Sequence, residues 1–110
     1  MPAYIDPQCY IKTYYKRNEK SNIYSLGVLF WEISSGISPF SEIPLFNISL
    51  YIIEGIRETP ISNTPFEYQQ LYENCWKKDP NQRPDIDEIH RALNQLKLQF
   101  NNNSEQLKFV

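Results

Sequence analysis

The chain has 110 residues, which is enough for one domain with a modest hydrophobic core and too few for two. Its 11 basic and 13 acidic residues give a formal net charge of -2 with no long block of either sign, so the composition argues against a nucleic-acid or membrane surface. An aromatic content of 15% is far from that of disordered chains, so we expect most of the sequence to fold.

The two cysteines, Cys9 and Cys75, lie far apart and have no partner pattern of Cys and His that would hold a metal ion. We interpret both as reduced thiols of an intracellular protein, with Cys75 in the core. No apolar run approaches the roughly 20 residues of a membrane span, and no signal-peptide pattern is present. The sequence therefore predicts a soluble protein of the cytoplasm, with the nucleus as the alternative.

Residues 1–15 contain Pro2, Pro7 and several tyrosines without a sustained period, so we expect an ordered loop with at most one helical turn. A basic loop follows, formed by Lys12, Lys16, Arg17 and Lys20. A solvated connection is the simpler interpretation of this loop. A contact with a phosphate or an acidic peptide is the alternative.

Residues 21–36 are expected to form the central helix. Glu32 is their only charged side chain among a majority of apolar ones, so no face of such a helix suits water. The stretch spans about four helical turns, which is too long for an ordinary strand. Ser21 or Asn22 is predicted to cap its start, because a short side-chain oxygen can accept from free backbone N–H groups. Gly36 suits the position just past the helix end, where φ is positive.

Two further helices are predicted after this one. Residues 45–54 carry apolar side chains at helical spacing and end at Gly55. Residues 65–77 are predicted to follow a cap at Thr64, with Glu67 at the position that a capping box requires. Their apolar stripe is the cleanest in the chain and consists of Tyr68, Leu71, Tyr72, Cys75 and Trp76.

The last predicted helix covers residues 85–98, with Asp85 as its cap and Glu88 at the capping-box position. Its buried seam is expected to be Ile86, Ile89, Leu93 and Leu96. The domain is predicted to end near residue 100, and residues 101–110 are expected to form a flexible tail. Because no alternating run is long enough to found a sheet, the predicted fold class is all-α, with a buried central helix surrounded by about three others.

The residues contain no recognisable active site. The chain's three glycines lie too far apart for a phosphate-binding loop. The single histidine, His90, falls outside the apolar seam of the last helix, so a solvated side chain is favoured over a catalytic or metal-binding one. Trp31 and Trp76 are interpreted as core aromatics without a ligand. No catalytic, cofactor-binding or metal residue is predicted.

Several motifs in a fixed order nevertheless resemble the C-terminal half of a protein kinase catalytic domain. They are the run from Asn22 to Ile33, then Ser35-Gly36, Pro39-Phe40, Cys75-Trp76, Asp79-Pro80 and Arg83-Pro84. The Cys-Trp, Asp-Pro and Arg-Pro series is most similar to the tyrosine-kinase and tyrosine-kinase-like branches. The resemblance covers about residues 2 to 98 and implies a family activity of ATP-dependent phosphorylation of protein Ser/Thr or Tyr, with a tilt towards Ser/Thr.

This resemblance implies that residues 2–8 end the activation segment, beside the peptide-substrate site of the family. The family groups that hold ATP and magnesium have no matching positions in this chain. The resemblance therefore implies a chain that is inactive alone and has no cofactor of its own. Its expected partners are protein substrates or partner proteins, reached through exposed apolar helix faces, and neither nucleic acid nor membrane. The alternative is a non-catalytic, pseudokinase-like module that binds proteins.

Two departures from the family pattern concern residues that we interpret as structural anchors. Kinases usually have Ala-Pro-Glu where this chain has Asp6-Pro7-Gln8, and the family's glutamate pairs with the arginine that matches Arg83. A neutral Gln8–Arg83 contact, worth about 0.5–1.5 kcal/mol instead of roughly 1.5–3, is therefore predicted. Asn22 stands where kinases usually place an aspartate, and we interpret it as a plain N-cap.

Overall fold

The structure is a computed structural model that describes the backbone of residues 2–107 and the side chains of residues 2–99. Within those residues it consists of helices and loops and has no strand, which confirms the predicted all-α class. The elements are two 3-10 helices, η1 (Pro2–Tyr4) and η2 (Pro80–Gln82), and the α-helices α1 (Pro7–Ile11), α2 (Glu19–Ser35), α3 (Leu45–Ile53), α4 (Phe66–Cys75) and α5 (Ile86–Leu107). None of these helices is long and apolar enough to cross a membrane.

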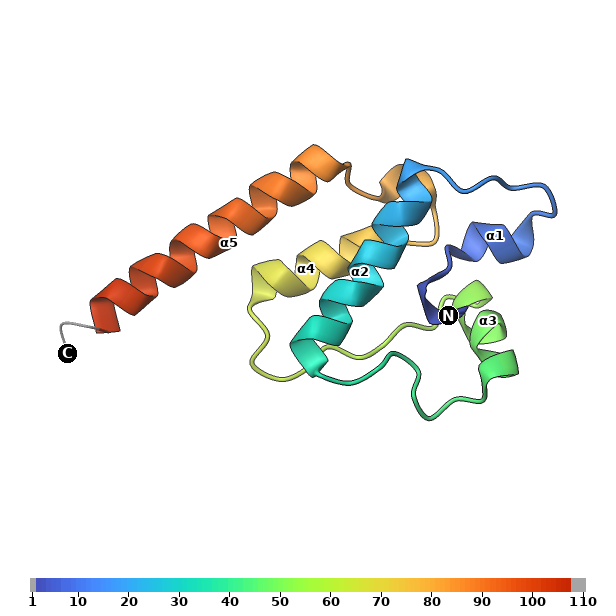
Figure 1. Ribbon diagram of the computed structural model, residues 1–110, viewed down its shortest axis with the longest axis horizontal. Coiled ribbons are helices and arrows are strands. Elements are labelled where there is room, and N and C mark those ends of the chain that lie inside the picture. Colours follow the sequence, from blue (N-terminus) through green and yellow to red (C-terminus); the bar gives the residue numbers. More distant parts are fainter. Residues whose placement is uncertain (1, 108–110) are drawn as a thin grey trace.

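Helix α2 lies at the centre of the molecule, with α4 alongside it, α1 and α3 on one side and α5 running outwards on the other (Figure 1). The contact between α2 and α4 is very close at Gly27. A Cβ atom added there would lie 2.6 Å from the Cβ of Cys75 and 3.0 Å from the backbone oxygen of Tyr72. Only glycine allows the two helices to approach this closely.

The start of α2 differs from the prediction. Asn18 is the N-cap: its side chain accepts from the backbone N–H of Ser21 at 3.2 Å, and the Ser21 hydroxyl accepts from the N–H of Asn18 at 3.3 Å. Asn22 lies inside the helix with an exposed side chain, so its interpretation as the N-cap is wrong. The reciprocal pair satisfies two free donors, where a cap at Asn22 would satisfy one.

The end of α2 is as predicted, but the helix is buried on one side only, since Leu29 and Ile33 are 40% and 66% exposed. Gly36 has a φ of 75°, and its N–H donates to the carbonyl of Glu32 at 2.8 Å. The Trp31 side chain is 1% exposed, and its indole N–H donates to the carbonyl of Thr59 at 2.9 Å. Trp76 is also buried, with its ring centre 4.9 Å from that of Tyr72. Both tryptophans are therefore core aromatics.

Helix α4 confirms its predicted stripe but not its predicted cap. Leu71, Tyr72, Cys75 and Trp76 are buried, and Tyr68 is half-buried. Thr64 does not cap the helix: Pro65 holds the N-cap position and no side chain caps the helix start. Thr64 lies one residue earlier, in a turn in which its hydroxyl donates to the carbonyl of Ile61 at 2.7 Å.

Helix α5 begins as predicted, since the backbone N–H of Glu88 donates to the Asp85 carboxylate at 2.8 Å. Its seam is shorter than expected: Ile89 is 1% exposed and Leu93 is half-buried, but Ile86 is 60% exposed and is not a seam residue. The helix runs outwards from the body (Figure 1), and Ile86 in its first turn lines a hollow beside the start of α2 instead of packing into the core.

The predicted tail of residues 101–110 falls largely on this outer part of α5. The backbone continues as helix to Leu107, seven residues into the stretch that the sequence assigned to a tail. Residues 108–110 lie outside the described residues. The flexibility of this tail and a domain boundary near residue 100 remain predictions.

Candidate functional site

The polar centre of the molecule is a buried ion pair between Asp6, which lies just before α1, and Arg83, which follows η2. The two side chains are 0% exposed. The guanidinium donates from Nη1 to Oδ2 of Asp6 at 2.9 Å and from Nη2 to Oδ1 at 2.8 Å. Such a bidentate, charge-assisted pair fixes the relative orientation of the two segments as well as their distance.

Each N–H group of the Arg83 guanidinium has an acceptor. Besides Asp6, it donates to the backbone carbonyls of Lys77 at 2.7 Å, Lys20 at 2.8 Å and Lys78 at 3.2 Å. A guanidinium has five N–H donors, and the two to Asp6 and three to carbonyls account for all of them. Arg83 therefore connects the start of α2, the segment after α4 and the residues before α1.

The Asp6 carboxylate also accepts hydrogen bonds from groups other than Arg83. It accepts from the Ser21 hydroxyl at 3.0 Å and from the backbone N–H of Gln8 at 3.0 Å. Burial by itself raises the pKa of Asp6, but the hydrogen bonds from Arg83, from the Gln8 backbone and from Ser21 outweigh it. The pKa of Asp6 in the folded protein lies below its usual value, so the carboxylate is ionised at neutral pH.

The aromatic ring of Tyr24 is in contact with two guanidinium groups. The Cζ atoms of Arg83 and Arg57 are 5.1 Å and 5.2 Å from the ring centre, which is cation–π range. Arg57 also donates to the carbonyls of Trp76 and Ile52, each at 3.0 Å. We call Asp6, Tyr24, Arg57 and Arg83 the arginine cluster; it joins the segment before α1 to the ends of α3 and α4.

The predicted contact between Gln8 and Arg83 is wrong. The Gln8 amide instead donates to the carbonyl of Lys78 at 3.1 Å. Arg83 has no N–H group left for Gln8, because the carboxylate of Asp6, two residues earlier, takes the place that the family pattern gives to the glutamate. The sequence reasoning missed Asp6, although an acidic residue directly before Pro7 was the available signal. It also missed Tyr24 and Arg57 as members of the cluster.

The other predicted anchors lie apart from one another. Asn22 is exposed on α2, Trp31 lies near the far end of the same helix, and Trp76 contributes only its backbone carbonyl to the arginine cluster. In the described residues, no group of three or more His, Cys, Asp or Glu side chains could hold a metal ion. His90 is exposed, and burial raises the pKa of the Cys75 thiol to about 12. No nucleophile or proton carrier is assembled among these residues.

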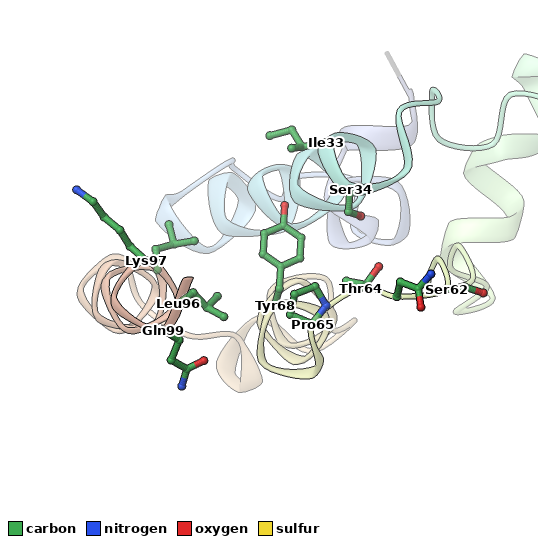
Figure 2. Close-up of a pocket in the computed structure, with 11 residues that line it drawn as sticks. Ile33, Ser34, Ser62, Thr64, Pro65, Tyr68, Leu96, Lys97 and Gln99 are labelled. Carbon is green, nitrogen blue, oxygen red and sulfur yellow. The ribbon is translucent and has the colours of Figure 1, made fainter. Parts of the chain in front are cut away.

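A mostly apolar pocket of about 640 Å³ lies between the end of α2, the loop before α4, and α5. Figure 2 shows Ile33 and Ser34 on one wall, Pro65 and Tyr68 on another, and Leu96 on the side of α5. The Tyr68 hydroxyl is already engaged, since it donates to the carbonyl of Phe30 at 2.7 Å. The lining also includes polar side chains, Ser62, Asn63, Lys97 and Gln99 among them, so the pocket is not purely apolar.

Comparison with known proteins identifies the class to which this helical arrangement belongs. The family model for protein tyrosine and serine/threonine kinases matches residues 4–93. The chain therefore belongs to the protein kinase family. Its helices correspond to the C-terminal part of the C-lobe of the catalytic domain, in the tyrosine-kinase-like range of the family.

Individual relatives agree with this assignment. The chain is 33% identical over 109 residues to mitogen-activated protein kinase kinase kinase 7 of Homo sapiens, an alignment that covers 97% of this chain and 18% of that protein. It is also 33% identical over 103 residues to cyclic GMP-binding protein C of Dictyostelium discoideum, which covers 90% of this chain and 4% of that protein. The chain thus spans less than a fifth of the length of these relatives.

Proposed function

We propose that these residues form the substrate-side scaffold of a protein kinase domain and that they do not transfer phosphate by themselves. One observation carries this proposal. By the family resemblance, residues 2–8 end the activation segment, and the buried Asp6–Arg83 pair fastens that segment to α2 and to the connection between α4 and α5. A segment held at a fixed place on a rigid helix suits the positioning of a peptide substrate.

The proposed lack of activity rests on the sequence. In the family, ATP and Mg²⁺ are held by a glycine-rich loop, a strand lysine, a His-Arg-Asp loop and an Asp-Phe-Gly motif. The 110 residues contain neither a His-Arg-Asp nor an Asp-Phe-Gly sequence. Because phosphoryl transfer is mostly positioning and electrostatics around Mg²⁺ and phosphate, we expect this chain alone to bind neither ligand. ATP binding, signalling, a cytoplasmic location and Ser/Thr phosphorylation are proposed for a complete kinase only.

Exposed apolar side chains on α2 support the proposal that these residues are a scaffold on which further protein packs. Ile33, which lines the pocket of Figure 2, is 66% exposed, and Leu29 on the same helix is 40% exposed. Apolar surface of this kind on a central helix is usual where further protein packs against it. We expect residues from the rest of a kinase domain to cover this surface.

A chimeric kinase domain tests the scaffold role directly. The chain would replace the matching segment of the human relative's kinase domain, and phosphorylation of a protein substrate would be measured. We expect a folded chimera with activity, and a folded but much less active chimera when Arg83→Met removes the ion pair. A chimera that folds by circular dichroism but transfers no phosphate, or one that does not fold, would contradict the scaffold role.

The chain alone provides the second test. Incubation with radiolabelled ATP, Mg²⁺ and a protein acceptor should give no incorporation above a blank without the chain. Thermal unfolding should not shift on addition of ATP and Mg²⁺, since a bound ligand would raise the melting temperature. Incorporation that scales with the chain's concentration and survives repeated purification would overturn the proposed lack of activity.

Protein binding without catalysis is a second candidate function, favoured by the outer face of α3. Leu45, Phe46 and Leu50 on this helix are 73%, 80% and 58% exposed. Such a face favours association. Sedimentation velocity over a range of concentrations should show association that Phe46→Asp reduces and Tyr14→Asp, at another highly exposed position, does not. Sedimentation as a monomer at all concentrations would contradict association through this face of α3.

A further inference from the structure

Four lysines from two distant parts of the sequence line one cleft. Lys12 and Lys20 lie before and at the start of α2, and Lys77 and Lys78 follow α4; together they face a cleft of about 710 Å³. The two pairs are separated by more than fifty residues of sequence. The basic loop of residues 12–20 is therefore only one wall of a basic site, which we call the lysine cleft.

The charge of the lysine cleft departs strongly from that of the chain. The lining carries four lysines and one acidic residue, Asp79, so its formal charge is 4 − 1 = +3, whereas the whole chain carries -2. The Asp79 carboxylate is itself engaged, since it accepts from the backbone N–H of Asn81 at 2.9 Å. Lys16 and Arg17 lie in the loop between two lining residues, Tyr15 and Asn18, and add to the positive field.

The arginine cluster organises this cleft. The guanidinium of Arg83 holds the backbone carbonyls of three of the four lining lysines, Lys20, Lys77 and Lys78. The Gln8 amide holds the carbonyl of Lys78 as well. The backbones of these lysines are thus held by hydrogen bonds from Arg83 and Gln8.

Two of the four lysine side chains are also held in place. The ammonium group of Lys20 donates to the carbonyl of Arg83 at 2.8 Å, and that of Lys12 lies 5.7 Å from the ring centre of Tyr15. Lys77 and Lys78 are exposed and carry no ion pair to an acidic side chain of the described residues. A site in which positive groups are partly preorganised and partly free is suited to an incoming anion.

We propose that the lysine cleft binds an acidic peptide segment, with phosphorylated residues as its strongest ligands. Lysine ammonium groups bind phosphates and carboxylates as point charges. The volume of about 710 Å³ exceeds what a lone phosphate ion would fill and suits a short stretch of peptide. Two amide side chains in the lining, Asn81 and Gln82, can both donate to and accept from a peptide backbone.

The shape of the site favours a peptide over a membrane surface. Membrane-binding surfaces combine basic residues with apolar side chains that insert into the bilayer. Here the basic groups line a concave site whose other residues are mostly polar, and its only aromatic lining residue, Tyr15, lies beneath an ammonium group. This inference concerns a face away from the residues of Figure 2 and does not depend on phosphoryl transfer by the chain.

Fluorescence anisotropy with a labelled acidic peptide tests the proposal. The probe is a ten-residue peptide with two phosphoserines among Asp and Glu, and its unphosphorylated form is the comparison. We expect binding that weakens as salt is raised, because exposed charges are screened. The variant Lys77→Glu/Lys78→Glu should weaken binding at least about tenfold. The control Arg91→Glu/Lys97→Glu, with the same change in net charge on α5, should change it less than about twofold.

Several outcomes would overturn the proposal. Equal loss in the cleft variant and the control would indicate attraction by net charge alone, and no binding by the unmodified chain would remove the site. Vesicles with a third of anionic phosphatidylserine provide the other source of phosphate. Vesicle binding lost in the cleft variant, without peptide binding, would assign the cleft to lipid. Circular dichroism checks that both variants fold, and Lys12→Glu tests the opposite wall independently.

Discussion

The two ends of α2 are held in different ways. At its start, a few polar groups determine the structure: Ser21 in the capping box, Tyr24 in contact with two guanidiniums, and the Asp6–Arg83 pair beside them. Towards its end, α2 is held by apolar packing against α4 and by the burial of its own Trp31, while Ile33 stays largely exposed. The polar end depends on a small number of specific contacts, so a single substitution there should cost far more than one on the exposed part of the apolar end.

The largest expected effect comes from removing the buried carboxylate. Asp6→Ala should destabilise the chain by about 3–5 kcal/mol, because it leaves the Arg83 guanidinium buried without its counter-ion. Urea unfolding followed by circular dichroism measures this loss. Glu42→Ala, at an exposed acidic position, is the control and should stay within about 0.5 kcal/mol of the parent. A loss from Asp6→Ala no larger than the control's would show that the polar end is not specified by this pair.

Low pH should reduce the stability that Asp6 gives to the start of α2. The pKa of Asp6 is lower in the folded protein than its usual value of 3.8, so the folded state binds this proton less readily than the unfolded chain. The stability that Asp6 contributes is fully present above the unfolded pKa and is lost as the pH falls through the folded one. Free energies of unfolding measured from pH 6 to pH 2 should fall, and Asp6→Asn should flatten that fall. An unchanged slope in Asp6→Asn would indicate that other carboxylates cause it.

The apolar contact between α2 and α4 is tested at Gly27. Gly27→Ala should cost about 1–3 kcal/mol, since the new methyl group would lie 2.6 Å from the Cβ of Cys75, and two helices would have to move apart. Thermal unfolding measures the effect. Asn22→Ala, at an exposed position of the same helix, controls for the change in helix propensity. A Gly27→Ala variant as stable as Asn22→Ala would mean that the helices do not approach this closely.

A smaller effect distinguishes the two candidate caps of α2. Asn18→Ala should lower the stability by about 0.5–2 kcal/mol, because the backbone N–H of Ser21 loses its acceptor. Asn22→Ala should leave it almost unchanged. The reverse order of the two losses, measured by urea unfolding, would restore Asn22 as the cap and place the start of the helix later in the chain.

Most of the apolar packing could be predicted from the sequence, whereas the buried polar contacts could not. The stripe on α4, the end of α2 at Gly36 and both core tryptophans follow from local periodicity and from the conformational freedom of glycine. The cap of α2 could not be chosen by propensity, because Asn18, Ser21 and Asn22 are all good capping residues. The cap at Thr64 was wrong for a related reason: Thr64 lies in a local turn, and the helix begins one residue later than predicted, with Pro65 at the N-cap.

The arginine cluster was missed for a reason of a different kind. Its partners are separated by up to 77 residues, and the one local signal, an acidic residue directly before Pro7, does not show that Asp6 is buried. The family pattern placed the partner of Arg83 at Gln8, but in this chain the negative charge lies two positions earlier, at Asp6. The exposure of Ile86 was equally invisible, because it depends on the direction in which α5 leaves the body (Figure 1).

A pair of double-mutant cycles tests the central claim most directly, that Asp6 and not Gln8 is the partner of Arg83. One cycle combines Asp6→Asn with Arg83→Gln, and the other combines Gln8→Ala with Arg83→Gln, with unfolding free energies measured in urea. We expect a coupling energy of about 2–3 kcal/mol for Asp6 and Arg83, and less than about 0.5 kcal/mol for Gln8 and Arg83. A large coupling to Gln8 with a negligible coupling to Asp6 would contradict this account.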